Sequence, residues 1–200
     1  MHMQANNTGV GPHPKPWPSD PRYDRELLEN GDKRNVIDEY RYWKVEAIKA
    51  DLDRDRFDIH IAIENWQHDF NIGTIVRNAN AFNIAAVHII GKKHWNRRGA
   101  MVTDVYMHIF HHASIEDFQE AVQGRTIIGV DNIDGAQSID KFSYPNKPTL
   151  VFGSEGPGLS KEILDICQNV IMIPQYGSTR SVNVGVASGI ILHDTIRRTT

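Results

Sequence analysis

The chain has 200 residues, of which 40% are hydrophobic and only one, Cys167, is a cysteine. This length allows one ordinary domain with an extension, and the single cysteine excludes an internal disulfide and favours a cytoplasmic location. No run of about 18 apolar residues occurs, so no membrane-spanning segment is expected. The net charge of −3, from 22 basic and 25 acidic residues, argues mildly against a nucleic-acid partner when only the sum is considered.

The first part of the chain differs in composition from the rest. Residues 1–22 carry repeated prolines and glycines, which predict an extended arm or disorder, and they lack the apolar stretch of a secretory signal. Residues 23–56 are highly charged, with apolar residues at helical spacing, and predict an extension of one or two amphipathic helices. Because acidic and basic side chains alternate there, we expect this extension to cover the core rather than to contact nucleic acid.

Residues 57–200 alternate between strand and helix patterns. Strands are predicted at Ile59–Glu64, Ala86–Ile90, Thr126–Asp131, Thr149–Phe152 and Val170–Ile173. Helices are predicted at Ile72–Phe82, Ile115–Val122, Ser160–Ile166 and Val182–Ile196. Residues 108–111 could add a short strand. The alternation predicts one α/β domain with a mainly parallel sheet flanked by helices.

Three segments carry most of the chemical information. Asn71–Phe82 opens a helix after the first predicted strand, and Leu150–Ser160 is a strand end followed by several glycines. Ile171–Ile190 combines a strand, a polar loop and a helix crowded with Gly, Ala, Ser and Val. Such small residues lower intrinsic helix stability but permit close backbone approach. They suit a helix that passes through a tight space or packs against a copy of itself.

In this order and at this spacing, the segments resemble the three motifs of the SPOUT-class, TrmH-like RNA ribose 2′-O-methyltransferases. The resemblance covers residues 59–193. It implies the SPOUT α/β-knot fold, with a deep trefoil knot near the C-terminus that periodicity alone cannot reveal. It also implies S-adenosylmethionine as cofactor and tRNA or rRNA as substrate, with tRNA slightly preferred. The family further implies a homodimer in which the partner subunit helps to build each active site.

The glycine-rich turn after Phe152 suits a cationic ligand. Gly153 and Gly156 permit unusual backbone angles and close approach of a ligand, although an ordinary strand-to-helix turn would look similar. Glu155 disfavours a phosphate and suits the sulfonium and ammonium groups of S-adenosylmethionine. By the resemblance, the cofactor-binding residues are Phe152, Gly153, Glu155, Gly156, Ile173, Pro174, Ser181 and Val182.

The resemblance assigns the catalytic residues as Arg77, Asn71, Glu155, Ser181 and Asn183. The apolar neighbours of Arg77 indicate a buried helix, where a guanidinium needs a partner such as a phosphate, although most helical arginines are simply exposed. Asn71 could instead be a capping or turn residue, and Ser181 the N-cap of the final helix. Because a guanidinium scarcely deprotonates, we expect Arg77 to position RNA and stabilise charge. A substrate phosphate or water would then accept the proton of the attacking 2′-hydroxyl.

The loop after the second predicted strand is the candidate for further RNA contact. Its cations and indole are Lys92, Lys93, Trp95, Arg97 and Arg98. Lysine and arginine bind phosphate and a tryptophan stacks on bases, although charged loops are often simply solvated.

The histidines raise the question of a metal site. His108, His111 and His112 form the tightest group, but no cysteine or carboxylate cluster lies nearby at ligand spacing, so no metal is expected. Cys167 lies on an apolar helix face and is expected to pack in the core.

Two alternative functions remain open. The chain could be a non-catalytic RNA-binding or ribosome-assembly protein that keeps the fold, although such a protein need not retain the whole set of motif residues. It could also methylate a base nitrogen instead of ribose.

Overall fold

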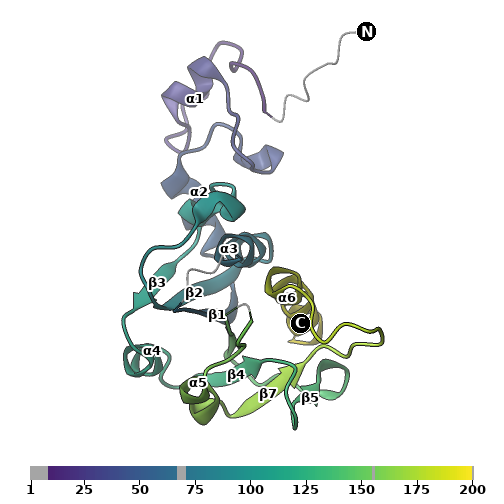
Figure 1. Ribbon diagram of the computed structural model, residues 1–200. Coiled ribbons are helices and arrows are strands. Elements are labelled where there is room, and N and C mark those ends of the chain that lie inside the picture. Colours follow the sequence, from purple (N-terminus) through teal and green to yellow (C-terminus); the bar gives the residue numbers. More distant parts are fainter. Residues whose placement is uncertain (1–8, 67–70, 155, 200) are drawn as a thin grey trace. The chain divides into compact units, whose positions relative to one another are not determined.

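The computed structural model describes residues 9–66, 71–154 and 156–199. The chain divides into two compact units, one ending at Asp55 and the other beginning at Arg56. The first unit contains α1 (Arg25–Asn30), a short 3₁₀ turn at residues 38–40 and α2 (Val45–Leu52) (Figure 1).

The first unit is organised around a buried carboxylate. Asp32 accepts hydrogen bonds from the Arg34 guanidinium at 2.9 and 2.7 Å and from the Tyr42 backbone N–H at 2.9 Å. Burial alone would raise the pKa of Asp32. The hydrogen bonds from the Arg34 side chain and from the backbone of Arg34 and Tyr42 outweigh this effect and lower the pKa to about 2. The backbone of Val10 pairs with that of Asp32, which fixes part of the expected N-terminal arm, whereas residues 1–8 lie outside the described residues.

The second unit holds a seven-stranded sheet in which neighbouring strands are parallel. The strands are β1 (Phe57–Asn65), β2 (Ile84–Gly91), β3 (Ile109–His112), β4 (Thr126–Val130), β5 (Gln137–Ser138), β6 (Pro148–Phe152) and β7 (Asn169–Met172). Their spatial order is β3-β2-β1-β6-β4-β7-β5. The predicted α/β class with a mainly parallel sheet is therefore confirmed, while β5 is too short to produce a sequence pattern.

Helices cover both faces of this sheet (Figure 1). On one face, α3 (Ile72–Ala81) and α6 (Val184–Thr199) contribute to the larger core, and on the other α4 (Ile115–Ala121) and α5 (Lys161–Ile166) contribute to the smaller. Successive side chains of a strand point to opposite faces. Accordingly, Ile61 and Ile63 belong to the larger core, whereas Ala62 belongs to the smaller. Cys167 is half-buried against the smaller core, as expected, and burial raises the pKa of its thiol to about 12.

The final helix differs from its prediction in where it begins. The Asn183 side-chain oxygen accepts hydrogen bonds from the backbone N–H groups of Gly185 at 2.9 Å and Val186 at 3.3 Å. The capping residue is therefore Asn183, α6 starts at Val184, and the alternative that Ser181 caps this helix is wrong. No helix in the described ranges has both the length and the apolar character needed to cross a bilayer.

Candidate active site

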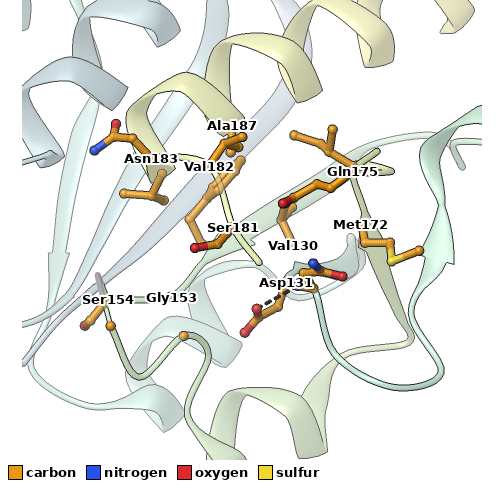
Figure 2. A pocket seen from close by; sticks show the side chains of 16 residues that line it. Val130, Asp131, Gly153, Ser154, Met172, Gln175, Ser181, Val182, Asn183 and Ala187 are labelled. Atoms are coloured by element: carbon orange, nitrogen blue, oxygen red, sulfur yellow. Dashed lines mark hydrogen bonds between the residues drawn. The ribbon is translucent and has the colours of Figure 1, made fainter. Parts of the chain in front are cut away.

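A cavity of about 370 Å³ opens where β4, β6 and β7 end. Ligands bind outside the carboxyl ends of strands in open parallel sheets, in pockets of about 300–1,000 Å³. Figure 2 shows that the side chains around it come from the segments after these strands and from the start of α6. The position and size of this cavity suit one small organic ligand.

Most of the predicted cofactor residues line this cavity. They are Phe152, Gly153, Gly156, Ile173, Ser181 and Val182. Pro174 is not among the lining residues, and Glu155 lies outside the described residues. Sequence reasoning missed three polar residues that also line the cavity, namely Asp131, Asn132 and Gln175.

The turn after β6 closes tightly on itself. A Cβ atom on Gly153 would lie 2.1 Å from the carbonyl carbon of Gly158 and 2.3 Å from the backbone nitrogen of Leu159. Gly156 has a φ of +102°, a conformation that favours glycine. The packing of the turn therefore leaves no room for a side chain at Gly153. The turn forms one wall of the cavity.

Two carboxylates hold this turn from the strands on either side of β6. From β4, the Asp131 carboxylate accepts the backbone N–H of Leu159 at 2.9 Å. From β1, Glu64 accepts the backbone N–H of Ser160 at 2.8 Å with one oxygen and the indole N–H of Trp66 at 2.8 Å with the other. Glu64 is only 1% exposed, so both of its oxygens depend on these protein donors.

We expect Glu64→Gln to lower the free energy of unfolding by about 1–3 kcal/mol. Both partners of Glu64 are donors, so an amide must direct its own N–H groups at one of them and leave that donor unpaired. Urea unfolding measures the change. Glu120→Gln, at an exposed position of α4, is the matched control and is expected to change stability by less than about 0.5 kcal/mol. Equal stability of the two variants would show that Glu64 does not hold the turn.

The first and third sequence motifs meet through two asparagines. The Asn183 side-chain N–H donates to the Asn71 side-chain oxygen at 2.9 Å. Asn71 stands before α3 without making a side-chain capping bond to that helix. The Asn183 amide thus fixes the start of α6 with its oxygen and reaches α3 with its nitrogen.

The small residues of α6 allow it to lie close to α3 within the same chain. The Asn78 side-chain N–H donates to the Gly185 carbonyl at 2.8 Å and to the Ser188 hydroxyl at 2.9 Å. A Cβ on Gly185 would lie 2.9 Å from the methyl group of Thr74. On other sides of the helix, Val186 is 55% and Ile190 39% exposed. An apolar strip of α6 therefore stays available for a further contact.

Arg77 is exposed, contrary to the burial argument made from its neighbours. Helix α3 is buried on one side through Ile75, Val76 and Ala79, but Arg77 projects from the other side. Among the described residues it forms no hydrogen bond or ion pair, and it does not line the cavity of its own chain. Its guanidinium is therefore available to an external anion.

The basic loop is held in place from β1. The Asn65 side-chain N–H donates to the carbonyls of Lys92 at 2.7 Å and His94 at 3.1 Å. The Trp95 ring is half-buried against the larger core, with the Arg97 guanidinium 5.6 Å from its centroid. Arg97 also pairs with Asp104 at 3.3 Å. Trp95 is thus partly engaged by the protein itself.

Other cations of the loop remain open to solvent. The side chains of Lys92, Lys93 and Arg98 are exposed. They form no ion pair among the described residues and therefore offer free positive charge just after the C-terminal end of β2.

Three histidines form a hydrogen-bonded row across β1, β2 and β3. The ring nitrogens of His88 lie 2.9 Å from His60 Nδ1 and 2.8 Å from His112 Nε2. Phe110 stacks on His88 with centroids 5.5 Å apart, and Phe118 meets it edge-on at 5.6 Å. Sequence reasoning missed this row because its members come from three separate strands.

The histidines grouped at residues 108–112 do not converge. His111 Nε2 lies 2.7 Å from the Gly91 carbonyl oxygen, whereas His112 joins His88. Within the part of the chain that the structure describes, no group of three or more His, Cys, Asp or Glu side chains is arranged to hold a metal ion.

We expect the histidine row to make stability depend on pH. Burial lowers the pKa of His88 from 6.5 to about 3 and that of His60 from 6.5 to about 4. Their neutral forms therefore stabilise the fold fully above pH 6.5, and this contribution is lost as pH falls toward the folded pKa values. For buried His88 the loss is about 1.4 kcal/mol per pH unit below pH 6.5.

Urea unfolding at pH 7, 6 and 5 measures this effect. His88→Gln removes one of the two titrating groups and should make the profile less steep, whereas His193→Gln, at an exposed position, should leave it unchanged. A profile that is as steep in His88→Gln as in the unaltered protein would contradict the assignment.

Comparison with known protein families gives one match that covers most of the chain. The model of the SpoU rRNA methylase family matches residues 58–193. A protein of Mycolicibacterium vanbaalenii described as an uncharacterized tRNA/rRNA methyltransferase is 29% identical over 195 residues, which cover 89% of this chain and 60% of that protein. A protein of Mycobacterium leprae with a similar description is 31% identical over 150 residues, covering 69% and 47%. The chain thus spans about half of the length of these relatives.

Solved structures with the same fold support this match. The A. aeolicus TrmH/SpoU tRNA modifying enzyme is 26% identical with a TM-score of 0.67, over 77% of this chain and 81% of that enzyme. The SpoU methyltransferase AviRb from Streptomyces viridochromogenes, in complex with the cofactor AdoMet, has a TM-score of 0.64 over 74% of this chain and 64% of that protein. Its identity of 21% indicates a shared fold only.

Proposed function

The chain belongs to the SpoU rRNA methylase family, and from this premise we propose that it transfers a methyl group from S-adenosylmethionine to a ribose 2′-hydroxyl of tRNA or rRNA. We slightly favour tRNA as the substrate, because a relative of known structure is described as a tRNA modifying enzyme and is 26% identical to this chain.

The meeting of three distant sequence segments is the observation that carries this proposal. Residues after β6 and β7 line one cavity, and Asn183 beside that cavity is hydrogen-bonded to Asn71 at the start of α3. Ligands bind at this edge of parallel sheets, so a cavity there with three motif segments around it supports a binding site.

The residues of the cavity fit an adenosine-based donor. Phe152, Ile173 and Val182 offer apolar surface for a purine ring, while Asp131 and Ser181 offer acceptors for hydroxyl or ammonium groups. Glu155 would add a further carboxylate beside the sulfonium. When bound, S-adenosylmethionine supplies a methyl group on a positively charged sulfur that leaves as a neutral thioether.

The residues of the protein would act mainly by positioning and by charge. Both the nitrogen and the oxygen of the Asn183 side-chain amide are hydrogen-bonded, so its orientation is fixed. It can therefore orient a substrate group that lies between Asn71 and the cavity. Exposed Arg77 would hold a phosphate of the target nucleotide, and a substrate phosphate or water would accept the 2′-hydroxyl proton. Alignment of the attacking oxygen with the methyl group can lower the barrier by several kcal/mol.

We further propose a homodimer with shared active sites. Arg77 does not line the cavity of its own chain, which supports a role for it at the cavity of a second copy. The exposed Val186 and Ile190 on α6 would provide apolar contact surface for that copy.

Two further expectations follow from the family. The C-terminal segment would form the trefoil knot, and the RNA substrate would place the protein in the cytoplasm.

The basic loop would contact the RNA backbone away from the reaction. Lys92, Lys93 and Arg98 would bind phosphates, and Arg97 would do so after exchanging its partner Asp104 for RNA. Because the Trp95 ring is half-buried, only its exposed part would be available to stack on a base.

Methyl transfer to total RNA with labelled S-adenosylmethionine tests the proposed function. Label recovered in alkali-resistant dinucleotides would support ribose methylation, because a 2′-O-methyl group blocks hydrolysis of the next linkage. Label in alkali-released mononucleotides would indicate a base-nitrogen methyltransferase. RNA binding without any incorporation would identify a non-catalytic binder.

A further inference from the structure

The cavity contains a polar side chain whose hydrogen-bonding capacity is not used by the protein. Gln175 follows β7 and lines the cavity, but its side-chain oxygen is buried and has no hydrogen-bond partner in the described part of the chain. A buried acceptor without a hydrogen-bond partner destabilises the fold, and a ligand that donates to it removes this penalty. By contrast, the Asp131 carboxylate on the same cavity accepts backbone N–H groups of Leu159 and Asn132.

The surroundings of Gln175 are suited to a flat apolar group. Val130, Ile173 and Ala187 line the same cavity and pack against the larger core. Figure 2 shows the Gln175 side chain extending toward Val130, on the side of the cavity away from Gly153 and Ser154. A ligand group in this region therefore meets apolar side chains and one acceptor.

Only one part of the proposed donor combines these properties. Its ribose hydroxyls and its ammonium group are strongly hydrated and suit the carboxylate and hydroxyl of Asp131 and Ser181. Its adenine ring has apolar faces and an exocyclic amine at one edge, which is a hydrogen-bond donor. The terminal torsion of glutamine is broad and soft, so the buried amide can turn toward such a donor without leaving a rotamer.

Resting on the proposed function, we propose that the Gln175 side-chain oxygen accepts a hydrogen bond from the exocyclic amine of the adenine of S-adenosylmethionine. Gln175 is then a specificity-determining residue for the cofactor. It is a contact in addition to the cofactor-binding residues that the family resemblance implies.

Calorimetric binding in a double-mutant cycle tests this contact without turnover. The probes are S-adenosylhomocysteine and its counterpart with unsubstituted purine, which lacks the amine. The unaltered protein should bind the adenine compound about five- to tenfold more tightly than the purine compound. In Gln175→Leu this preference should fall below about twofold, because the acceptor has been removed.

Two further measurements keep the test decisive. Tyr176→Ala, at a neighbouring side chain that is 92% exposed, should retain the full preference for adenine. Unchanged melting temperatures would show that the variants are folded, and Gln175→Met offers a second side chain without the amide if the leucine variant is not. A preference that persists in Gln175→Leu or Gln175→Met, with methyl transfer intact in the unaltered protein, would overturn this inference alone. Failure of the unaltered protein to bind either compound would overturn the proposed function as well.

Discussion

Arg77→Ala is expected to lower kcat for RNA methylation by about a hundredfold or more while S-adenosylhomocysteine binds as before. Loss of a positioning contact at the reacting nucleotide can cost about a hundredfold in rate. Because Arg77 is exposed and lies off the cavity of its own chain, its removal leaves the cavity intact. Single-turnover methyl transfer and calorimetry measure the two quantities separately. Lys161→Ala, the same charge change on the opposite face of the sheet, is the matched control and should leave both values unchanged.

Mixing two inactive variants tests whether Arg77 serves the partner subunit. Ser181→Trp should block the cavity of its own chain, while its Arg77 remains available. A mixed dimer of Arg77→Ala and Ser181→Trp subunits then contains one open cavity facing one intact arginine, and activity should return. If Arg77 serves its own chain, each subunit of the mixed dimer lacks one part and activity stays absent. That second result would contradict the shared site.

Gly153→Ala is expected to abolish binding of S-adenosylmethionine and to lower the free energy of unfolding by about 3 kcal/mol. The added Cβ would lie between 2.1 and 2.3 Å from three backbone atoms of Gly158 and Leu159. Backbone atoms cannot move aside as a flexible side chain can, so the turn must open and the cavity wall with it. Calorimetry and urea unfolding measure the two effects.

Alanine substitutions at two other glycines serve as comparisons for Gly153→Ala. A Cβ on Gly177 meets nothing within 4 Å, so Gly177→Ala should change stability by less than about 0.5 kcal/mol. A Cβ on Gly156 also meets nothing within 4 Å, but its φ of +102° disfavours alanine, and a loss of about 1–2 kcal/mol is expected. If Gly153→Ala is no more harmful than Gly156→Ala, the close packing of the turn is not what shapes the cavity.

The elements of the second unit, which begins at Arg56, were predictable because their patterns are local. A strand buried on both faces, such as β6, appears in the sequence as a short, mostly apolar run. In β1, isoleucine instead recurs at every second position from Ile59 to Ile63, which is the spacing of a strand. The start of α6 was misplaced by two residues because both Ser181 and Asn183 are suitable caps. Only the three-dimensional path of the chain decides between them.

Contacts between distant segments were not predictable from one sequence. Glu64 lies near the end of β1, and nothing in the sequence indicates that it will meet the backbone of Ser160. The exposure of Arg77 depends on its angular position on α3, and the apolar neighbours that suggested burial occupy the other side. Motif resemblance therefore located the cavity, whereas the supporting carboxylates and Gln175 required coordinates.

Calorimetric titration of the purified chain with S-adenosylmethionine tests the central claim most directly, because methyl transfer and the role of Gln175 both depend on donor binding in the cavity beside β4, β6 and β7. We predict saturable binding of one donor per chain, lost in Gly153→Ala and retained in Arg77→Ala. A folded protein that takes up no donor, or that binds it equally well in Gly153→Ala, would contradict the account.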